Sequence, residues 1–271
     1  MIHWRLERSG KAYGIILPLL TLAAIYSAFN LSSTLLWGTA FFSFLYYVIG
    51  LTIGMHRLFA HKSFSVHPWT RRVLLWLSCQ TLQGSPIFWA AVHRSRHHAH
   101  TDTDLDLHSP IHGRWSAFIG WNFTDDERGW LLREYVKSRK TFEDKFAHTC
   151  QEYYTHIVIA NLLIVALISF LFFGNFYLVL ASLNGSFYAL IMTGLINIFG
   201  HTPIKCITYK HPEFDLKNNA VNNLVLGIVS CGEAFHQNHH AKPMATNFGM
   251  RWYEFDLGHY IVELIRNDRK N

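Results

Sequence analysis

Histidine is the residue type with the strongest chemical pattern in this sequence. The 271 residues contain 18 histidines, and three short motifs begin at His56 (HRLFAH), His93 (HRSRHH) and His236 (HQNHH). These motifs hold two, three and three histidines, and His201 lies near the end of an apolar stretch. Neutral imidazole is a ligand for iron, zinc and copper. Eight or nine such ligands are too many for one ion and suit two, so the motifs predict a two-metal site.

The spacing within the first two motifs constrains which histidines can share a metal. Residues three or four apart lie on one face of an α-helix, so His93 and His97 can converge on one centre. The adjacent His97 and His98 point about 100° apart and suit two neighbouring metals. His56 and His61 are separated by about 140° around a helix, so they suit different metals or a bent backbone.

In the third motif, His236, His239 and His240 also have helical spacing and can converge on one centre. Zinc hydrolysis is an alternative chemistry, but the sequence contains no H-E-x-x-H motif, so its general base would have to come from elsewhere. The four cysteines are far apart and form no C-x-x-C motif. They therefore favour neither a thiolate metal site nor a disulfide framework.

The elements that must position these motifs are long and apolar. Residues 12–55 and 157–204 contain no Asp, Glu, Lys or Arg, and each block can cross a bilayer twice at about 20 residues per helix. We expect an all-α integral membrane fold with four transmembrane helices in two hairpins, near residues 12–29, 35–54, 157–173 and 176–200. The alternative, a buried helical core, is disfavoured by two uncharged blocks of this length.

The charged residues predict the orientation of these spans. All 24 Lys and Arg lie outside the two apolar blocks, and the net charge is +6. The positive-inside rule therefore places residues 55–156, residues 201–271 and both termini in the cytoplasm, with the two-metal site in a helical cap. We expect one membrane domain over residues 1–271, in a bacterial cell membrane in preference to the endoplasmic reticulum. The basic face suits anionic headgroups or acidic partners, and no soluble basic domain suggests nucleic-acid binding.

Two further stretches have a distinct composition. Residues 69–92 are apolar but carry Gln80, Gln83, Gly84, Ser85 and Pro86 midway, so we expect two short helices that lie on or dip into the membrane. Residues 124–152 are charged and helix-prone and predict a solvated cytoplasmic element.

Together the motifs resemble the three histidine boxes of the membrane-bound fatty acid desaturases, of the stearoyl-CoA (delta-9) type. The similarity extends to DLDLHSP after the second box, NIFGH around His201, and RWYEFDLGHY after the third box. It covers most of the chain from about Ile53 onward. Two departures are an H-x-x-x-H-H second box, where animal enzymes have H-x-x-H-H, and Asp106-Leu107-His108 in place of Asp-Pro-His. The second departure leaves the role of His108 open.

The resemblance implies a di-iron centre that uses O2 as co-substrate. Its implied ligands are His56, His61, His93, His97, His98, His201, His236, His239 and His240, with Asn197 reaching one metal through a water molecule. A helix–helix hydrogen bond is the alternative role for Asn197. The chain has no H-P-G-G signature of a fused cytochrome b5, so we expect a separate electron donor such as a ferredoxin or cytochrome b5. An acidic donor would suit the basic face.

Acidic residues near the motifs could hold ligand imidazoles by hydrogen bonds. The candidates are Asp102, Asp104, Asp106, Asp215, Asp256 and Glu233. Solvation or helix capping is the alternative for each.

The expected reaction is the formation of a cis double bond near the middle of a saturated long acyl chain, carried on CoA or on a lipid. Phe44 and Val48 precede His56 by 12 and 8 residues, which places Val48 roughly 12 Å from it along a helix. We expect these two side chains to close the far end of an acyl tunnel, with ordinary helix packing as the alternative.

A di-iron membrane hydroxylase is the alternative enzyme. A metal transporter or a haem-binding electron carrier would need polar ligands deep in the spans. The two apolar blocks contain one histidine, His201, and it lies near the end of the second block.

Overall fold

The computed structural model describes residues 2–123 and 144–268, with side chains described from Tyr13 onward. Its long helices are α1 (Ile2–Phe29), α2 (Ser33–Ser43) running on into η1 (Phe44–Ala60), α8 (Tyr154–Phe173) and α9 (Tyr177–Phe199). The shorter helices are α3 (Pro68–Cys79), α4 (Pro86–Val92), η2 (His93–His98), η3 (Pro110–His112), α5 (Arg114–Phe118), η4 (Gly120–Phe123), α7 (Lys145–Glu152), α10 (Leu224–Val229), α11 (His236–Ala241) and α12 (Leu257–Ile265). Strands β1 (Thr208–Tyr209) and β2 (Asn222–Asn223) form one antiparallel pair.

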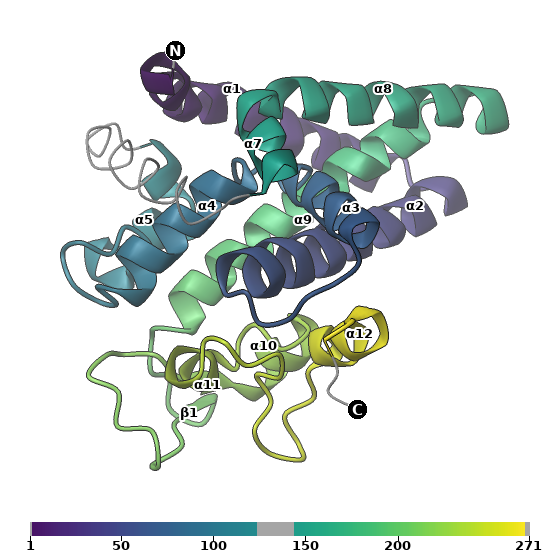
Figure 1. Cartoon of the computed structure of the whole chain (residues 1–271). Helices are drawn as coiled ribbons and strands as arrows, with labels where there is room; N and C mark the ends of the chain where they lie inside the picture. Colours follow the sequence, from purple (N-terminus) through teal and green to yellow (C-terminus); the bar gives the residue numbers. More distant parts are fainter. Residues whose placement is uncertain (1, 124–143, 269–271) are drawn as a thin grey trace.

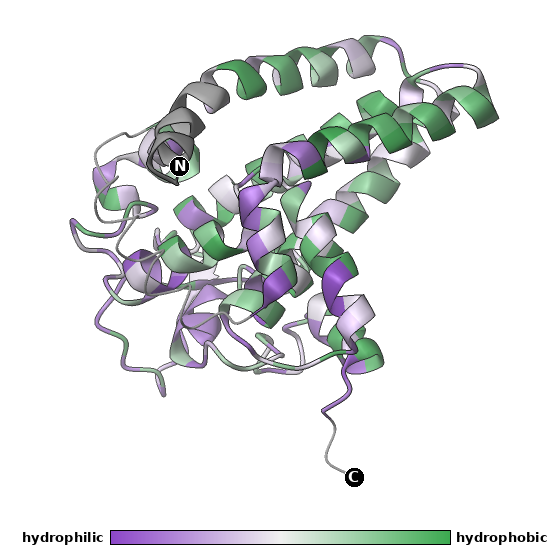
Figure 2. Cartoon of the chain, turned by 45° about the horizontal axis from the view of Figure 1, so that its top comes forward, coloured by the Kyte–Doolittle hydropathy of each residue, from purple (hydrophilic) through white to green (hydrophobic). Residues whose placement is uncertain are grey.

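Among the described residues, three helices are long and apolar enough to cross a membrane: Ser33–Ala60, Tyr154–Phe173 and Tyr177–Phe199. They match three of the four expected spans. The expected first span lies within α1, whose apolar part, Tyr13–Phe29, is a shorter helix. Figure 2 shows hydrophobic residues concentrated on the long helices and hydrophilic residues on the shorter helices and loops. The mostly helical membrane character is therefore supported, and three of the four expected spans are long enough within the described residues.

The second span is longer than the expected 35–54, because the helix continues to Ala60 without a break. Its last part, η1, is π-helical, with i→i+5 backbone bonds such as His61 N–H to the His56 carbonyl at 3.0 Å. The membrane-spanning helix thus carries the first histidine motif directly on its end.

Close backbone packing holds this span against α9. A Cβ on Gly185 of α9 would lie 2.7 Å from the Phe42 backbone, so only glycine permits this approach. The α8–α9 turn is stabilised by Gly174, which ends α8 in the left-handed conformation, and by Asn175, whose side-chain oxygen accepts from the Tyr177 N–H at 2.9 Å. These contacts fix the height at which the end of α9 presents His201.

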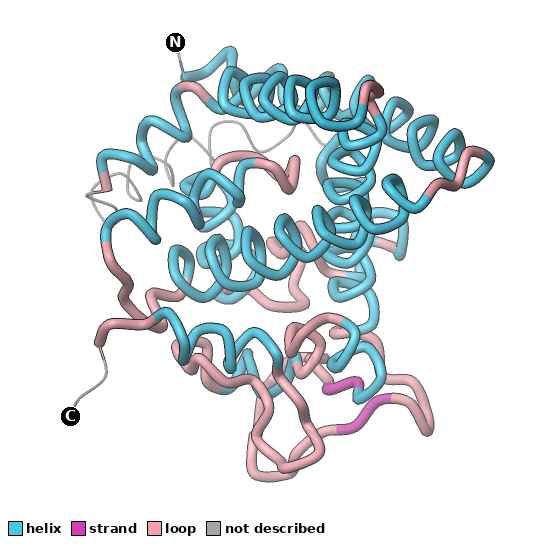
Figure 3. Tube along the Cα trace, turned by 90° about the vertical axis from the view of Figure 1, so that its right-hand side faces the viewer, coloured by secondary structure: helices cyan, strands magenta, loops and turns pink. Residues whose placement is uncertain are grey.

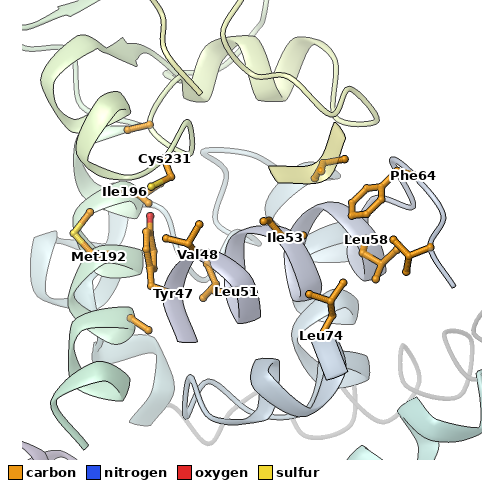
Figure 4. Packing of buried hydrophobic residues seen from close by; sticks show 14 residues of the cluster. Tyr47, Val48, Leu51, Ile53, Leu58, Phe64, Leu74, Met192, Ile196 and Cys231 are labelled. Atoms are coloured by element: carbon orange, nitrogen blue, oxygen red, sulfur yellow. The ribbon is translucent and has the colours of Figure 1, made fainter. Parts of the chain in front are cut away.

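The C-terminal segment packs beside the ends of η1 and α9 (Figure 1). Figure 3 shows its loops and two strands gathered at one end of the helical bundle. A buried apolar cluster joins the parts: Val48 of η1, Met192 of α9, and Cys231 and Val262 of the C-terminal segment all belong to it (Figure 4). The third histidine motif is therefore anchored to the same rigid body as the first.

The expectation of two short helices over residues 69–92 is confirmed by α3 and α4, which meet at the polar turn around Gly84. The expected charged element at 124–152 lies mostly outside the described residues. Its described end contains α7, which begins at a cap in which Asp144 accepts from the Phe146 and Ala147 N–H groups.

Candidate metal centre

The nine predicted histidines lie in two adjacent groups. The first group comprises His56, His61, His93, His98 and His239, and the second comprises His97, His201, His236 and His240. Within each group the potential ligand atoms all lie within 4.8 Å of one another. Three motifs and the end of α9 therefore converge at the junction between the bundle and the C-terminal segment.

The imidazoles meet through their Nε2 atoms. In the first group, Nε2–Nε2 distances are 3.0 Å for His56–His239, 2.9 Å for His61–His93, 3.0 Å for His93–His98 and 2.9 Å for His98–His239. In the second group they are 2.9 Å for His201–His236, 3.1 Å for His97–His240 and 3.2 Å for His236–His240.

These distances are those of ligands around a common ion. Imidazole nitrogens about 2.1 Å from a metal and at right angles to each other lie about 3.0 Å apart. Seven contacts between identical nitrogen atoms at this distance fit two metal sites.

Three carboxylates select the histidine tautomer that can bind a metal through Nε2. The Nδ1–H groups of His56, His97 and His201 donate to Glu233 at 2.6 Å, Asp106 at 3.1 Å and Asp102 at 3.1 Å. A proton on Nδ1 leaves the Nε2 lone pair free and directed into the group. Although burial opposes it, contact with His97 holds the pKa of Asp106 below its usual range, so this carboxylate is an acceptor only.

Burial also keeps the imidazoles neutral. Desolvation, followed by repulsion from neighbouring imidazoles, lowers the pKa of His61, His93, His98, His239 and His240 well below the usual range. His236 is shifted in the same direction for the same reasons. The groups are thus arranged to bind cations without first losing protons.

Backbone geometry decides which histidines share a group, and it corrects the expectation for the second motif. His93 lies in the first group with His98, whereas His97 lies in the second. The reason is that η2 is π-helical, with the Ala99 N–H bonded to the Arg94 carbonyl at 3.2 Å, so residues five apart align. The same pattern in η1 puts His56 and His61 in one group. Of the two expectations for this pair, different metals or a bent backbone, the structure supports a change in the backbone.

The third motif also differs from expectation. It lies on the α-helical α11, where His236 and His240, four residues apart, share the second group. His239 points to the first group, with its Nε2 3.0 Å from that of His56. Convergence of all three on one centre is therefore wrong, and α11 lies between the two groups.

Of the other acidic candidates, Asp104 and Asp215 are exposed and hold no imidazole of the described chain. Asp256 is buried, caps α12 by accepting from the His259 N–H, and bonds Arg57. Three of the six acidic candidates thus hold ligand histidines, and Asp256 acts one step further away.

Arg57 is a residue that the sequence interpretation missed. Its side chain is completely buried, its Nη2 donates to both oxygens of Asp256 at 2.9 and 3.1 Å, and its Nη1 lies 3.4 Å from Glu233. Its guanidinium lies 4.1 Å above the Phe248 ring. Because Glu233 bonds His56, this cation connects α12 to the first group. An arginine directly after the first histidine was the only available signal.

His108 lies beside the second group without belonging to it. Its ring is 5.6 Å from that of His97 and 4.2 Å from Trp121, and its buried Nε2 has no hydrogen-bond partner in the described structure. Burial, with His97 nearby, lowers its pKa to about 3. It can therefore join His97 and Asp106 in a third cluster of possible ligands, but only as a neutral imidazole.

The remaining predicted site residues lie in different surroundings. Asn197 is buried, and its amide donates to the Ala117 carbonyl at 3.1 Å. Val48 is 5% exposed within the apolar cluster of Figure 4, whereas Phe44 is 42% exposed. The two side chains therefore differ in burial although they are about one helical turn apart.

Comparison with known proteins gives a consistent result. Residues 32–267 match the family model described as fatty acid desaturase. The chain is 28% identical over 221 residues to acyl-CoA 5-desaturase AL21 of Anemone leveillei, covering 80% of this chain and 64% of that protein. It is 29% identical over 221 residues to the sn-1 stearoyl-lipid 9-desaturase of Anabaena variabilis, covering 80% and 75%. Delta-9 acyl-lipid desaturase 1 of Arabidopsis thaliana is 29% identical over 217 residues, covering 80% and 68%.

Proposed function

The chain belongs to the fatty acid desaturase family, and we propose that it is a membrane oxidoreductase that forms a cis double bond near the middle of a long saturated acyl chain. The observation that carries this proposal is the convergence of nine histidines into two groups with metal-ligand spacing. The similar proteins named above include desaturases of acyl-CoA and of acyl-lipids, and either carrier is compatible with this chain.

Two iron ions are the metals that best suit the proposal. The nine histidines would hold them, with Asn197 contributing through a water molecule to the second group. Bound iron, with O2 and two electrons, would supply the oxidising power needed to break unactivated C–H bonds. The chain's own part is to fix the orientation of three imidazoles, because Glu233, Asp106 and Asp102 accept from the Nδ1–H groups of His56, His97 and His201.

The protein also restricts water at this site. Trp89 stacks on His93 with ring centroids 4.4 Å apart, and Phe248 packs 4.4 Å from His239. Seven of the nine histidine side chains are buried, and His98 and His240 are partly exposed. We assign to this apolar wall the exclusion of water that would otherwise compete with the acyl chain.

The setting of the reaction follows from the charge distribution. The histidines lie at the ends of η1 and α9 that continue into Lys- and Arg-bearing segments, which supports a cytoplasmic active site in a multi-pass bacterial membrane protein. One domain over residues 1–271 would contain the whole site. Electrons would come from a separate ferredoxin or cytochrome b5 that docks on the basic face.

The experiment is the fatty-acid profile, with double-bond location by mass spectrometry, of a desaturase-deficient host that expresses the chain. We expect a new mid-chain cis monoene that disappears in His97→Ala. It should persist in His112→Ala, because His112 is exposed and outside both groups. A hydroxylated product in place of the monoene would contradict desaturation, and an unchanged profile in His97→Ala would contradict the role of the histidine groups.

A further inference from the structure

A groove with a volume of about 520 Å³ lies between α3 and α7, away from the histidine groups. Five residues of α3 and three of α7 line it: Trp69, Arg72, Val73, Trp76 and Leu77, and Lys145, Phe146 and Thr149. The α3 residues occupy one face of that helix because they are spaced three or four residues apart. The opposite face of α3 is buried against η1, where the Ser78 hydroxyl donates to the Gly50 carbonyl at 2.7 Å.

The mouth of the groove is positively charged. Arg72 and Lys145 are both exposed, and no Asp or Glu of the described chain lines the groove. Asp144, the described acid that precedes Lys145 in the chain, is already paired with Arg71. The Arg72 guanidinium lies 4.9 Å above the Trp69 ring, which holds it at the rim.

The other end of the groove is apolar and continuous with the transmembrane bundle. The Trp76 indole N–H donates to the Asn161 side chain in α8 at 3.3 Å, and Leu77 packs against the cluster that contains Leu35 and Tyr46. Trp69 and Val73 are 66% and 54% exposed. An exposed Trp beside basic residues is the pattern of a membrane–water interface.

A buried cluster separates this groove from the metal centre. Trp76 and Phe146 pack against the cluster from the groove side, and its member Trp89 stacks on His93. An occupant of the groove would therefore not reach the histidines.

We propose that the groove binds one anionic phospholipid, with its phosphate between Arg72 and Lys145 and one acyl chain along Val73 and Trp76. A soluble acidic peptide would satisfy the two cations but not the apolar end, which opens to the membrane. A zwitterionic lipid would satisfy the apolar end, but its ammonium group would oppose the two cations. A net anionic headgroup on a diacyl lipid satisfies both parts.

The test uses the full chain purified in a neutral detergent and titrated with dioleoyl phosphatidylglycerol or dioleoyl phosphatidylcholine, with retained lipid counted by native mass spectrometry. We expect stronger retention of phosphatidylglycerol. The Arg72→Gln/Lys145→Gln double variant should weaken it by on the order of 25-fold, at about fivefold per charge. The control, Lys205→Gln/Lys217→Gln, removes the same charge from exposed positions between α9 and β2 and should change retention little.

Three results would overturn the proposal: equal retention of the two lipids, equal loss in both double variants, or unchanged retention in the Arg72/Lys145 variant. Competition by millimolar inorganic phosphate that fully displaces the lipid would also contradict it, because the acyl chain would then contribute nothing. Val73→Asp, which places a carboxylate in the apolar part of the groove, gives an independent test and should reduce retention without altering the two cations. All of these residues are outside the histidine groups, so desaturation can be measured separately.

Discussion

The two histidine groups differ in their number of ligands, their backbone and their support. The first has five imidazoles, three of them from π-helical segments and a fourth, His61, from the residue directly after one; His56 is held by Glu233. The second has four imidazoles, two of them from the α-helix α11, and two are held by Asp106 and Asp102. With four imidazoles in place of five, the second group has more room for another ligand. Carboxylates orient two of its imidazoles, whereas a carboxylate orients one imidazole of the first group. Neighbouring sites of one chain can thus be built by different means.

Removal of a ligand from either group should have the largest effect. His98→Ala and His236→Ala each delete one member of one group, and we expect product formation to fall by more than about 100-fold, beyond the usual effect of losing a residue that only orients a ligand. Bound iron, measured by plasma mass spectrometry, should fall from two toward one per chain. Loss of both ions in either variant would contradict two histidine groups that bind metal independently.

The first group should depend on Arg57 for stability. Arg57→Gln leaves Asp256 and Glu233 buried without their cation, which costs about 3–5 kcal/mol for pairs of this kind. Thermal unfolding in detergent measures this loss. Arg71→Gln is the matched control, because the Arg71–Asp144 pair is partly exposed and is worth at most about 1 kcal/mol. Equal effects of the two substitutions would contradict a special role for the buried cation.

The carboxylates should act selectively on their own groups. Asp106→Asn and Glu233→Gln remove the charge that holds Nδ1–H on His97 and His56, and each should weaken metal affinity of its group by about 10–100-fold. Iron retention during titration with a chelator would show one ion lost early in each variant. A uniform loss of both ions in both variants would mean that the carboxylates stabilise the fold and do not tune a particular group.

The metal-free protein should lose stability in acid. Burial lowers the pKa of seven group histidines in the folded chain, and that of His108 to about 3, whereas unfolding returns each to about 6.5; the seven are His61, His93, His98, His201, His236, His239 and His240. As pH falls below 6.5, the unfolded chain therefore binds protons that the folded chain does not. Each histidine then costs up to about 1.4 kcal/mol per pH unit, until the pH reaches its folded pKa.

Thermal unfolding of the metal-free chain at pH 7.5 and 5.5 measures this slope. His108→Gln should reduce it by the contribution of one imidazole and leave both groups complete. A midpoint that is independent of pH over this range would contradict the neutral state of the buried histidines.

The smallest effect is expected at the far end of the span that carries the first group. Val48→Ala should lengthen the preferred acyl chain by a few carbons, because Val48 is buried in the cluster of Figure 4. Phe44→Ala should have less effect, since Phe44 is largely outside that cluster. Product chain lengths from mixed acyl substrates would decide, and unchanged lengths in both variants would rule out the tunnel end.

Much of the site could be predicted from the sequence, because the sequence itself gives the ligand residue type and the order of the three histidine motifs. The assignment of His97 and His98 to different groups could also be predicted from their adjacency. The pairing of His93 with His98 could not, because an α-helical and a π-helical turn have no distinct signature in HRSRHH. Arg57 and Glu233 are 176 positions apart, and only the folded chain brings them into contact.

The spans show the same limit. Uncharged blocks predict apolar helices well, as for residues 157–173 and 176–200, but they do not show where a helix ends. The second span continues past its apolar run because Glu233 and Asp256 of the C-terminal segment pair with the polar side chains at its end. The first expected span, 12–29, lies within α1 and ends with it at Phe29.

The most direct test of two metal groups is an anomalous difference map at the iron absorption edge, from crystals of the iron-loaded chain. We expect two peaks, one bounded by His56, His61, His93, His98 and His239 and the other by His97, His201, His236 and His240. A single peak, or a second peak at His97, Asp106 and His108 in place of the four-histidine group, would contradict it.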